Sequence, residues 1–190
     1  MSVSEQSSAA VAPAGSRDHD SWLVFCAAVY NFGDIGVCWR LARQLVDEHR
    51  QPVVLFVDDW HKALTFVHRA DARALTQIEE QGVVLRHWRD DIDWSEAMAS
   101  VAVVIEAFGC RLPDALIAVM ASESIRRTPP CWINLEYLSA EAWVEGYHGQ
   151  QSLQSVPGAG QSSPPAVLSK IFFFPGFTSS TGGLLRETNL

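Results

Sequence analysis

Five acidic side chains stand where chemistry is expected in an α/β sheet, because each comes after an apolar run of strand length. They are Asp34, Asp58, Asp59, Glu106 and Glu136. Ligands of an open parallel sheet bind beyond the carboxyl ends of its strands, so we expect these carboxylates at one edge. Crowded carboxylates repel one another unless a cation, a metal ion or a guanidinium lies among them. The pattern therefore predicts an edge suited to a positively charged guest.

Each of these carboxylates also has a purely structural explanation. Asp34 stands where the N-cap of a helix belongs, and N-capping alone stabilises a helix by about 1 kcal/mol. Asp58 and Asp59 can be solvated turn residues, and Glu106 and Glu136 can act as caps at the ends of their strands. The five together favour a site more strongly than any one of them does.

Several other kinds of site are disfavoured. The segment 30–36 contains two glycines, but it has neither the GxGxxG spacing of a dinucleotide site nor the lysine of a phosphate-binding loop. The GxSxG sequence of α/β-hydrolases is absent. The six histidines lack metal-ligand spacing, so we expect no metal and no cofactor. The cysteines form no CxxC pair and lie among apolar residues, which predicts free, buried thiols of a reducing cytoplasm: Cys26, Cys38, Cys110 and Cys131.

Short apolar runs alternate with amphipathic stretches along most of the chain. Strands are predicted at 22–29, 53–57, 83–85, 101–105, 131–135 and 171–174. Helices are predicted through Val37 and Leu45 up to Pro52, through Leu64 and Val67 as far as Ile78, over 113–122, and from Ser139 through Trp143. Such alternation implies right-handed βαβ crossovers. We therefore expect the α/β class, with a Rossmann-like doubly wound parallel sheet covered on both faces.

Composition narrows the function further. Of 190 residues, 48% are apolar, and 22 acidic against 14 basic side chains leave a formal charge of −8. Such a surface disfavours nucleic-acid binding, which needs a basic face. Four tryptophans in predicted elements are expected to pack in the core or at its edge rather than stack on bases: Trp22, Trp39, Trp132 and Trp143. With no run of about 18 apolar residues and no export signal, we expect a cytoplasmic protein that does not use a membrane.

The chain divides into four parts by composition. Residues 1–20 are predicted to be a disordered tail, 21–147 the folded α/β domain, and 148–169 a flexible loop. This loop lacks Asp, Glu, Lys and Arg and is rich in Gly, Pro, Ser and Gln. Residues 170–190 supply a last strand, a polar turn at 178–183 and the start of a further segment. Without a terminal helix or a charged tail, the chain is expected to be half of a larger protein.

Long strings of this sequence resemble one bacterial enzyme family. They are NFGDIGVCWRLAR at 31–43, VDD at 57–59, IEAFGC at 105–110 followed by LP, WINLEYLSAE at 132–141 followed by WVEG, and FFFPGF at 172–177 followed by TGGLLRE. The strings run in order over about residues 22–187 and are similar to those of the protein-arginine rhamnosyltransferases that modify elongation factor P.

The resemblance implies the N-terminal half of a GT-B glycosyltransferase, in which two Rossmann-like domains face each other across a cleft. It implies inverting transfer of L-rhamnose from dTDP-β-L-rhamnose to an arginine side chain of elongation factor P, which activates that factor. Residues 21–147 correspond to the domain that binds the acceptor protein. The nucleotide sugar is expected mainly on a C-terminal domain that is missing here, so this fragment alone is expected to be inactive.

The resemblance also suggests the site residues. Asp34 matches the family's aspartate in Gly-Asp-Ile-Gly and is the expected general base. The residues expected to bind the substrate are Tyr30, Asn31, Phe32, Gly33, Gly36, Glu106 and Glu136, with residues 31–33 forming the pocket wall. Tyr30 replaces a second aspartate of the family, which removes a charge-assisted contact worth about 1.5–3 kcal/mol. A phenol there could instead accept a hydrogen bond or stack on the guanidinium, with Glu106 or Glu136 supplying the charge. The polar segment 150–165 also departs from the family pattern.

Two other functions remain open at this point. The chain could be a non-catalytic acidic module that docks elongation factor P, which binding without turnover would reveal. It could also be an unrelated α/β protein that binds a small molecule, if the matching strings are accidental.

Overall fold

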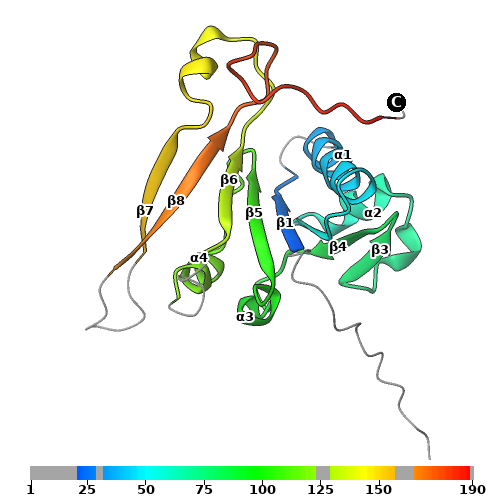
Figure 1. Ribbon diagram of the computed structural model, residues 1–190. Helices are drawn as coiled ribbons and strands as arrows, with labels where there is room; N and C mark the ends of the chain where they lie inside the picture. The colour runs from blue at the N-terminus through cyan, green and yellow to red at the C-terminus, as the bar shows by residue number, and fades with distance from the viewer. Residues whose placement is uncertain (1–20, 29–31, 123–128, 157–164, 189–190) are drawn as a thin grey trace, which may run out of the picture.

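The computed structural model describes residues 21–28, 32–122, 129–156 and 165–188, which fold around one eight-stranded sheet (Figure 1). Its strands are β1 (Ser21–Cys26), β2 (Val53–Val57), β3 (Gln77–Glu80), β4 (Val83–His87), β5 (Val101–Ala107), β6 (Cys131–Leu135), β7 (Gln151–Val156) and β8 (Ala166–Phe173). Their order across the sheet is β3-β4-β2-β1-β5-β6-β8-β7. The six inner strands are parallel, and β3 and β7 pair antiparallel at the two edges.

Helices cover both faces of this sheet, as the doubly wound prediction requires. They are α1 (Gly33–Asp47), α2 (Trp60–Phe66), α3 (Trp94–Ala97) and α4 (Asp114–Met120), with 3-10 turns η1 (Ala70–Ala72) and η2 (Ala142–Gly146). In β1, Val24 and Cys26 face α1 and α2, whereas Leu23 and Phe25 face α3 and α4. Because successive side chains of a strand point to opposite faces, one apolar run supplies both cores. The predicted α/β, Rossmann-like fold class is confirmed.

The second helix ends earlier than predicted. It stops at Phe66 instead of continuing toward Ile78, and the edge strand β3 comes after it. His68 takes a left-handed φ of 58°, and the N–H of Arg69 donates to the Leu64 carbonyl. This is a Schellman ending, at which glycine is usual. Since a histidine holds the position, the sequence contains no signal for the break.

The segment 148–169, predicted to be a flexible loop, contains strand β7 and the beginning of β8. Ser155 pairs with Val167 and Leu153 with Ser169 across this hairpin. The low charge of residues 148–169 is therefore compatible with strand structure, because the backbone groups of β7 find hydrogen-bond partners in β8. The residues between the two strands, 157–164, and the predicted tail 1–20 lie outside the described residues.

Other local predictions hold with changes at the ends of elements. The strand predicted at 83–85 extends to His87, and α4 begins directly after Pro113. The hydroxyl of Ser139 accepts from the N–H of Glu141, but the turn η2 comes next in place of a helix. Trp143 on this turn is 55% exposed and contacts the buried Phe174, so it packs at the edge of the fold rather than in the core.

The cysteines are all free thiols, as predicted, but they are not all buried. Cys26 and Cys38 are buried, Cys110 is partly buried and Cys131 is exposed at the start of β6. Burial raises the pKa of Cys110 to about 12. Within the described segments no three His, Cys, Asp or Glu side chains are grouped as a metal site, and no helix is long and apolar enough to cross a membrane.

Candidate functional site

Asp34 lies in the first turn of α1, close to where β1 delivers the chain to the carboxyl edge of the sheet. It is only 4% exposed. The N-cap residue of α1 is Phe32, so the N-cap explanation of Asp34 is wrong. A carboxylate in the first turn is favoured by the positive end of the helix dipole. The structure thus holds a buried acid at a position where ligands of this fold bind.

Tyr137, which sequence reasoning did not select, donates its hydroxyl to Asp34 Oδ1 at 3.1 Å. Tyr137 lies after β6, and its ring stacks on Phe108, which lies after β5, with ring centroids 4.3 Å apart and planes 13° apart. Phe32, whose ring lies 6.4 Å from that of Phe66, is 45% exposed. The ends of three adjacent segments therefore bring aromatic rings to the neighbourhood of one carboxylate. The sequence contained a signal for this arrangement, because an aromatic residue follows each of three strands: Phe32 after β1, Phe108 after β5 and Tyr137 after β6.

The two glycines of the predicted site serve the start of α1. Gly36 donates its N–H to the Phe32 carbonyl at 2.8 Å. A Cβ at Gly36 would lie 3.6 Å from the Phe66 ring, so α1 and α2 approach closely there. A Cβ at Gly33 would meet no described atom within 4 Å. The predicted substrate-binding residues Tyr30 and Asn31 lie outside the described residues.

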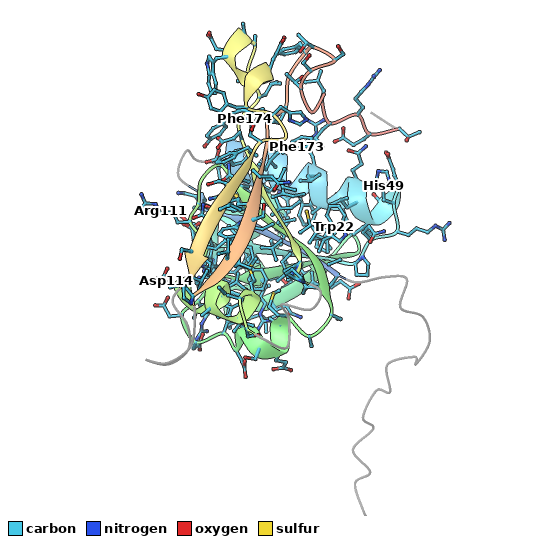
Figure 2. All side chains as sticks on the ribbon, turned by 60° about the vertical axis from the view of Figure 1, so that its left-hand side comes forward. Trp22, His49, Arg111, Asp114, Phe173 and Phe174 are labelled. Atoms are coloured by element: carbon cyan, nitrogen blue, oxygen red, sulfur yellow. The ribbon has the colours of Figure 1, made fainter. Side chains whose placement is uncertain are left out.

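Glu106 is 3% exposed and belongs to the opposite face of the sheet from Asp34. Its carboxylate accepts from Trp132 Nε1 at 3.1 Å, from the Arg111 backbone N–H at 3.2 Å and from Lys170 Nζ at 3.3 Å. Trp132 packs in the core under α3 and α4, whereas α1 covers the other core. Figure 2 shows Arg111 on one side of the β7–β8 hairpin and Trp22 on the other. The structure does not bring Glu106 together with Asp34.

Glu136 is tied to the same face as Glu106. It accepts a hydrogen bond of 2.6 Å from the side chain of Asn134, and its backbone N–H donates to the Phe173 carbonyl. Asn134 is 2% exposed and lies two residues from Trp132 along β6, so both side chains face α4. A substrate role for Glu136 stays a prediction.

Of the remaining acidic pair, Asp58 fits the alternative of a turn residue, whereas Asp59 is the N-cap of α2. Asp58 Oδ1 accepts from the backbone N–H groups of Ala28 and Asp59, each at 2.7 Å. Asp59 caps α2 by accepting from the N–H of Lys62 at 3.0 Å, which lowers the pKa of Asp59. Lys62 Nζ also lies 3.0 Å from Asp59 and donates to the Ala28 carbonyl. The five carboxylates therefore carry less net negative charge than the sequence predicted, because Lys62 neutralises Asp59 and Lys170 neutralises Glu106.

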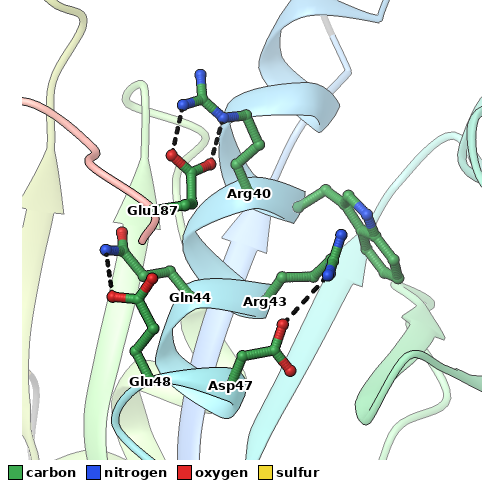
Figure 3. A pocket seen from close by; sticks show the side chains of 7 residues that line it. Arg40, Arg43, Gln44, Asp47, Glu48 and Glu187 are labelled. Carbon is green, nitrogen blue, oxygen red and sulfur yellow. Dashed lines mark hydrogen bonds and ion pairs between the residues drawn. The ribbon is translucent and has the colours of Figure 1, made fainter. Parts of the chain in front are cut away.

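A groove of about 330 Å³ lies beside the second half of α1, away from the first turn that carries Asp34 (Figure 3). Arg40 binds Glu187 through two hydrogen bonds of 2.6 and 2.7 Å, and this contact lowers the pKa of Glu187 to about 2. Gln44 donates to the Arg186 carbonyl, and Glu48 accepts from the backbone N–H of Thr188. Figure 1 shows the C-terminal segment running from the upper end of β8 to α1. Residues 186–188 thus lie against α1, and Glu187 forms part of the lining of this groove.

Comparison with known proteins gives one consistent result. Residues 22–190 match the family model described as Elongation-Factor P (EF-P) rhamnosyltransferase EarP. A protein-arginine rhamnosyltransferase of Pseudomonas putida is 50% identical over 170 residues, which are 90% of this chain and 41% of that protein. The Pseudomonas aeruginosa and Shewanella oneidensis proteins of the same name are 46% and 40% identical over 90% and 92% of the chain. The chain spans about two fifths of the length of these relatives.

Proposed function

Because the chain belongs to the elongation factor P rhamnosyltransferase family, we propose that it is the acceptor-side domain of an enzyme that glycosylates a protein arginine. The acceptor is elongation factor P, and the donor is dTDP-β-L-rhamnose, held mainly by a second domain. Transfer inverts the anomeric centre. Residues 21–147 receive the acceptor, and residues 170–190 supply the end of the last strand, β8, and the start of the connection to the donor domain.

The chemistry requires a carboxylate on the acceptor side. A guanidinium has a pKa above about 12 and delocalised lone pairs, so it is a poor nucleophile until a base orients it and accepts a proton. The arginine nitrogen forms the new C–N bond to the sugar, the anomeric C–O bond breaks, and dTDP leaves with the bonding electrons. The nitrogen's proton passes to Asp34. Orientation of the nitrogen in line with the anomeric carbon contributes several kcal/mol by proximity.

The buried carboxylate of Asp34 is the observation that carries this proposal. It is 4% exposed, lies in the first turn of α1 and accepts the Tyr137 hydroxyl. A carboxylate in such surroundings interacts strongly with a cation, since little water competes for it. The exposed faces of Phe32 and Tyr137, each 45% exposed, suit the planar guanidinium, which stacks on aromatic rings.

A chimaera tests the function. This chain replaces the matching part of the Pseudomonas putida relative, which then supplies the donor half. We expect mass spectrometry to show that the chimaera adds about 146 Da, one deoxyhexose residue, to an arginine of elongation factor P. Asp34→Asn is expected to lower the rate about 10²–10⁴-fold, as loss of a general base does.

Asp71→Asn is the matched control, because the Asp71 side chain is 70% exposed and pairs with Arg69 on the surface. An inactive chimaera that still binds elongation factor P would overturn the enzyme proposal in favour of a docking module. Asp34→Asn activity equal to that of Asp71→Asn would overturn the role of Asp34. Product from the 190-residue chain alone would refute the proposal that it is half of the enzyme.

A further inference from the structure

We propose that Tyr137 is the positioning residue of this site: its hydroxyl holds the Asp34 carboxylate in the orientation that receives the acceptor guanidinium. The inference rests on the proposed function. Tyr137 stands 103 positions from Asp34 in the chain, so the 3.1 Å bond from its hydroxyl to Asp34 Oδ1 joins the end of β6 to the first turn of α1.

The Tyr137 ring is itself held in place by its neighbours. It lies nearly parallel to the ring of Phe108, with 4.3 Å between centroids. The backbone N–H of Phe108 donates to the Leu135 carbonyl at 2.7 Å, which ties the end of β5 to the end of β6. The hydroxyl is therefore delivered to Asp34 by a rigid platform rather than by a mobile side chain.

Backbone strain at Phe108 supports a role beyond packing. Phe108 has a φ of 56°, a left-handed conformation that a bulky residue rarely adopts. Gly109 and Arg111 in the same turn also have positive φ, at 64° and 57°. Strained backbone of this kind costs roughly 1–3 kcal/mol and clusters at functional sites, where the surrounding structure maintains it. Here the conformation places Phe108 under the Tyr137 ring.

A hydrogen bond from a hydroxyl group to one oxygen of an aspartate carboxylate restricts the rotation of that carboxylate about its Cβ–Cγ bond. A base with a fixed orientation meets the guanidinium in one geometry, whereas a rotating base meets it in many. Displacing a reacting group by about 1 Å can cost about 10²-fold in rate. Loss of the hydroxyl should therefore lower kcat more than it weakens binding of the acceptor. The docking surface of elongation factor P extends beyond this one contact.

The test is Tyr137→Phe in the chimaera, which removes the hydroxyl and keeps the stacked ring. We expect kcat to fall about 10- to 100-fold and KM for elongation factor P to change less than about threefold. Because a buried carboxylate loses one donor, Tm should fall by roughly 3–12 °C, which leaves the enzyme folded at 25 °C. Tyr147→Phe is the matched control, since Tyr147 is 57% exposed and contacts Trp143 rather than Asp34. This control is expected to keep full activity.

A second variant, Tyr137→Leu, separates the hydroxyl from the ring. A Tyr137→Phe enzyme as active as the parent, with only Tyr137→Leu impaired, would show that ring packing alone matters and would overturn the inference. A loss of activity in Tyr137→Phe that disappears when the assay is run well below the Tm of this variant would overturn it as well. An inactive parent chimaera would instead count against the proposed function itself.

Discussion

The buried ion pair between Lys170 and Glu106 should stabilise the fold substantially, and Lys170→Met tests this. Lys170 Nζ lies 3.3 Å from Glu106, and the two side chains are 16% and 4% exposed. At that distance and an effective dielectric constant of about 20, the Coulomb attraction is about 5 kcal/mol. Methionine keeps most of the side-chain volume, but it leaves Glu106 buried without its cation. Breaking a buried pair from one side costs about 3–5 kcal/mol.

The loss can be measured by urea unfolding followed through tryptophan fluorescence. It is a large fraction of the roughly 5–15 kcal/mol that stabilises a typical domain, and it corresponds to a fall in Tm of roughly 6–20 °C. The double variant Glu106→Gln/Lys170→Met should recover part of the stability. A neutral amide oxygen can still accept from Trp132 Nε1, and no uncompensated charge remains buried.

Arg43→Met is the matched control, because Arg43 pairs with Asp47 on the surface of α1 with side chains 44% and 51% exposed. Such an exposed pair contributes about 0.3–0.5 kcal/mol. The reasoning is refuted if Lys170→Met costs no more than Arg43→Met, or if the double variant is as unstable as the two single changes added together.

Other contacts lead to three further predictions. The pKa of Glu187 is lowered to about 2 by its contact with Arg40, so the contact should persist at the ordinary glutamate pKa and be lost only as the pH falls toward 2. The Arg40 Nε–H resonance in NMR spectra should report this, and Glu187→Gln should abolish the transition. Cys131, the exposed cysteine, should be alkylated by iodoacetamide before the other three, as peptide mapping would show. Gly82→Ala should destabilise the fold by about 1–3 kcal/mol in urea unfolding, because φ is 78° and the new Cβ would lie 2.8 Å from Val46 Cγ1.

Where the position of a candidate residue depends on local sequence, the sequence predicted that position. The apolar run before Asp34 and the helical pattern after it are contiguous, so the carboxylate had to lie near the end of a buried strand. The same reasoning did not predict that Glu106 lies on the opposite face of the sheet from Asp34 and pairs with Lys170, which stands 64 positions further along the chain. A carboxylate's environment depends on whatever side chains the fold places against it, and no local pattern contains that information.

Tyr137 shows the same limit at the site itself. Its role depends on a bond to a residue 103 positions earlier and on a stack with Phe108 across two strand ends. The edge strands β3 and β7 were missed for a related reason: each is short and defined by its pairing with β4 or β8.

The sequence alone determined the alternation of buried strands and amphipathic helices, and the family. Both follow from patterns of neighbouring residues, namely the apolar periodicity and the motif strings. The tertiary structure decided which carboxylates meet cations, which aromatic ring supports Asp34, and where the sheet ends. Those outcomes depend on contacts between distant segments, which form only when the inner strands align in parallel and bring their carboxyl ends together.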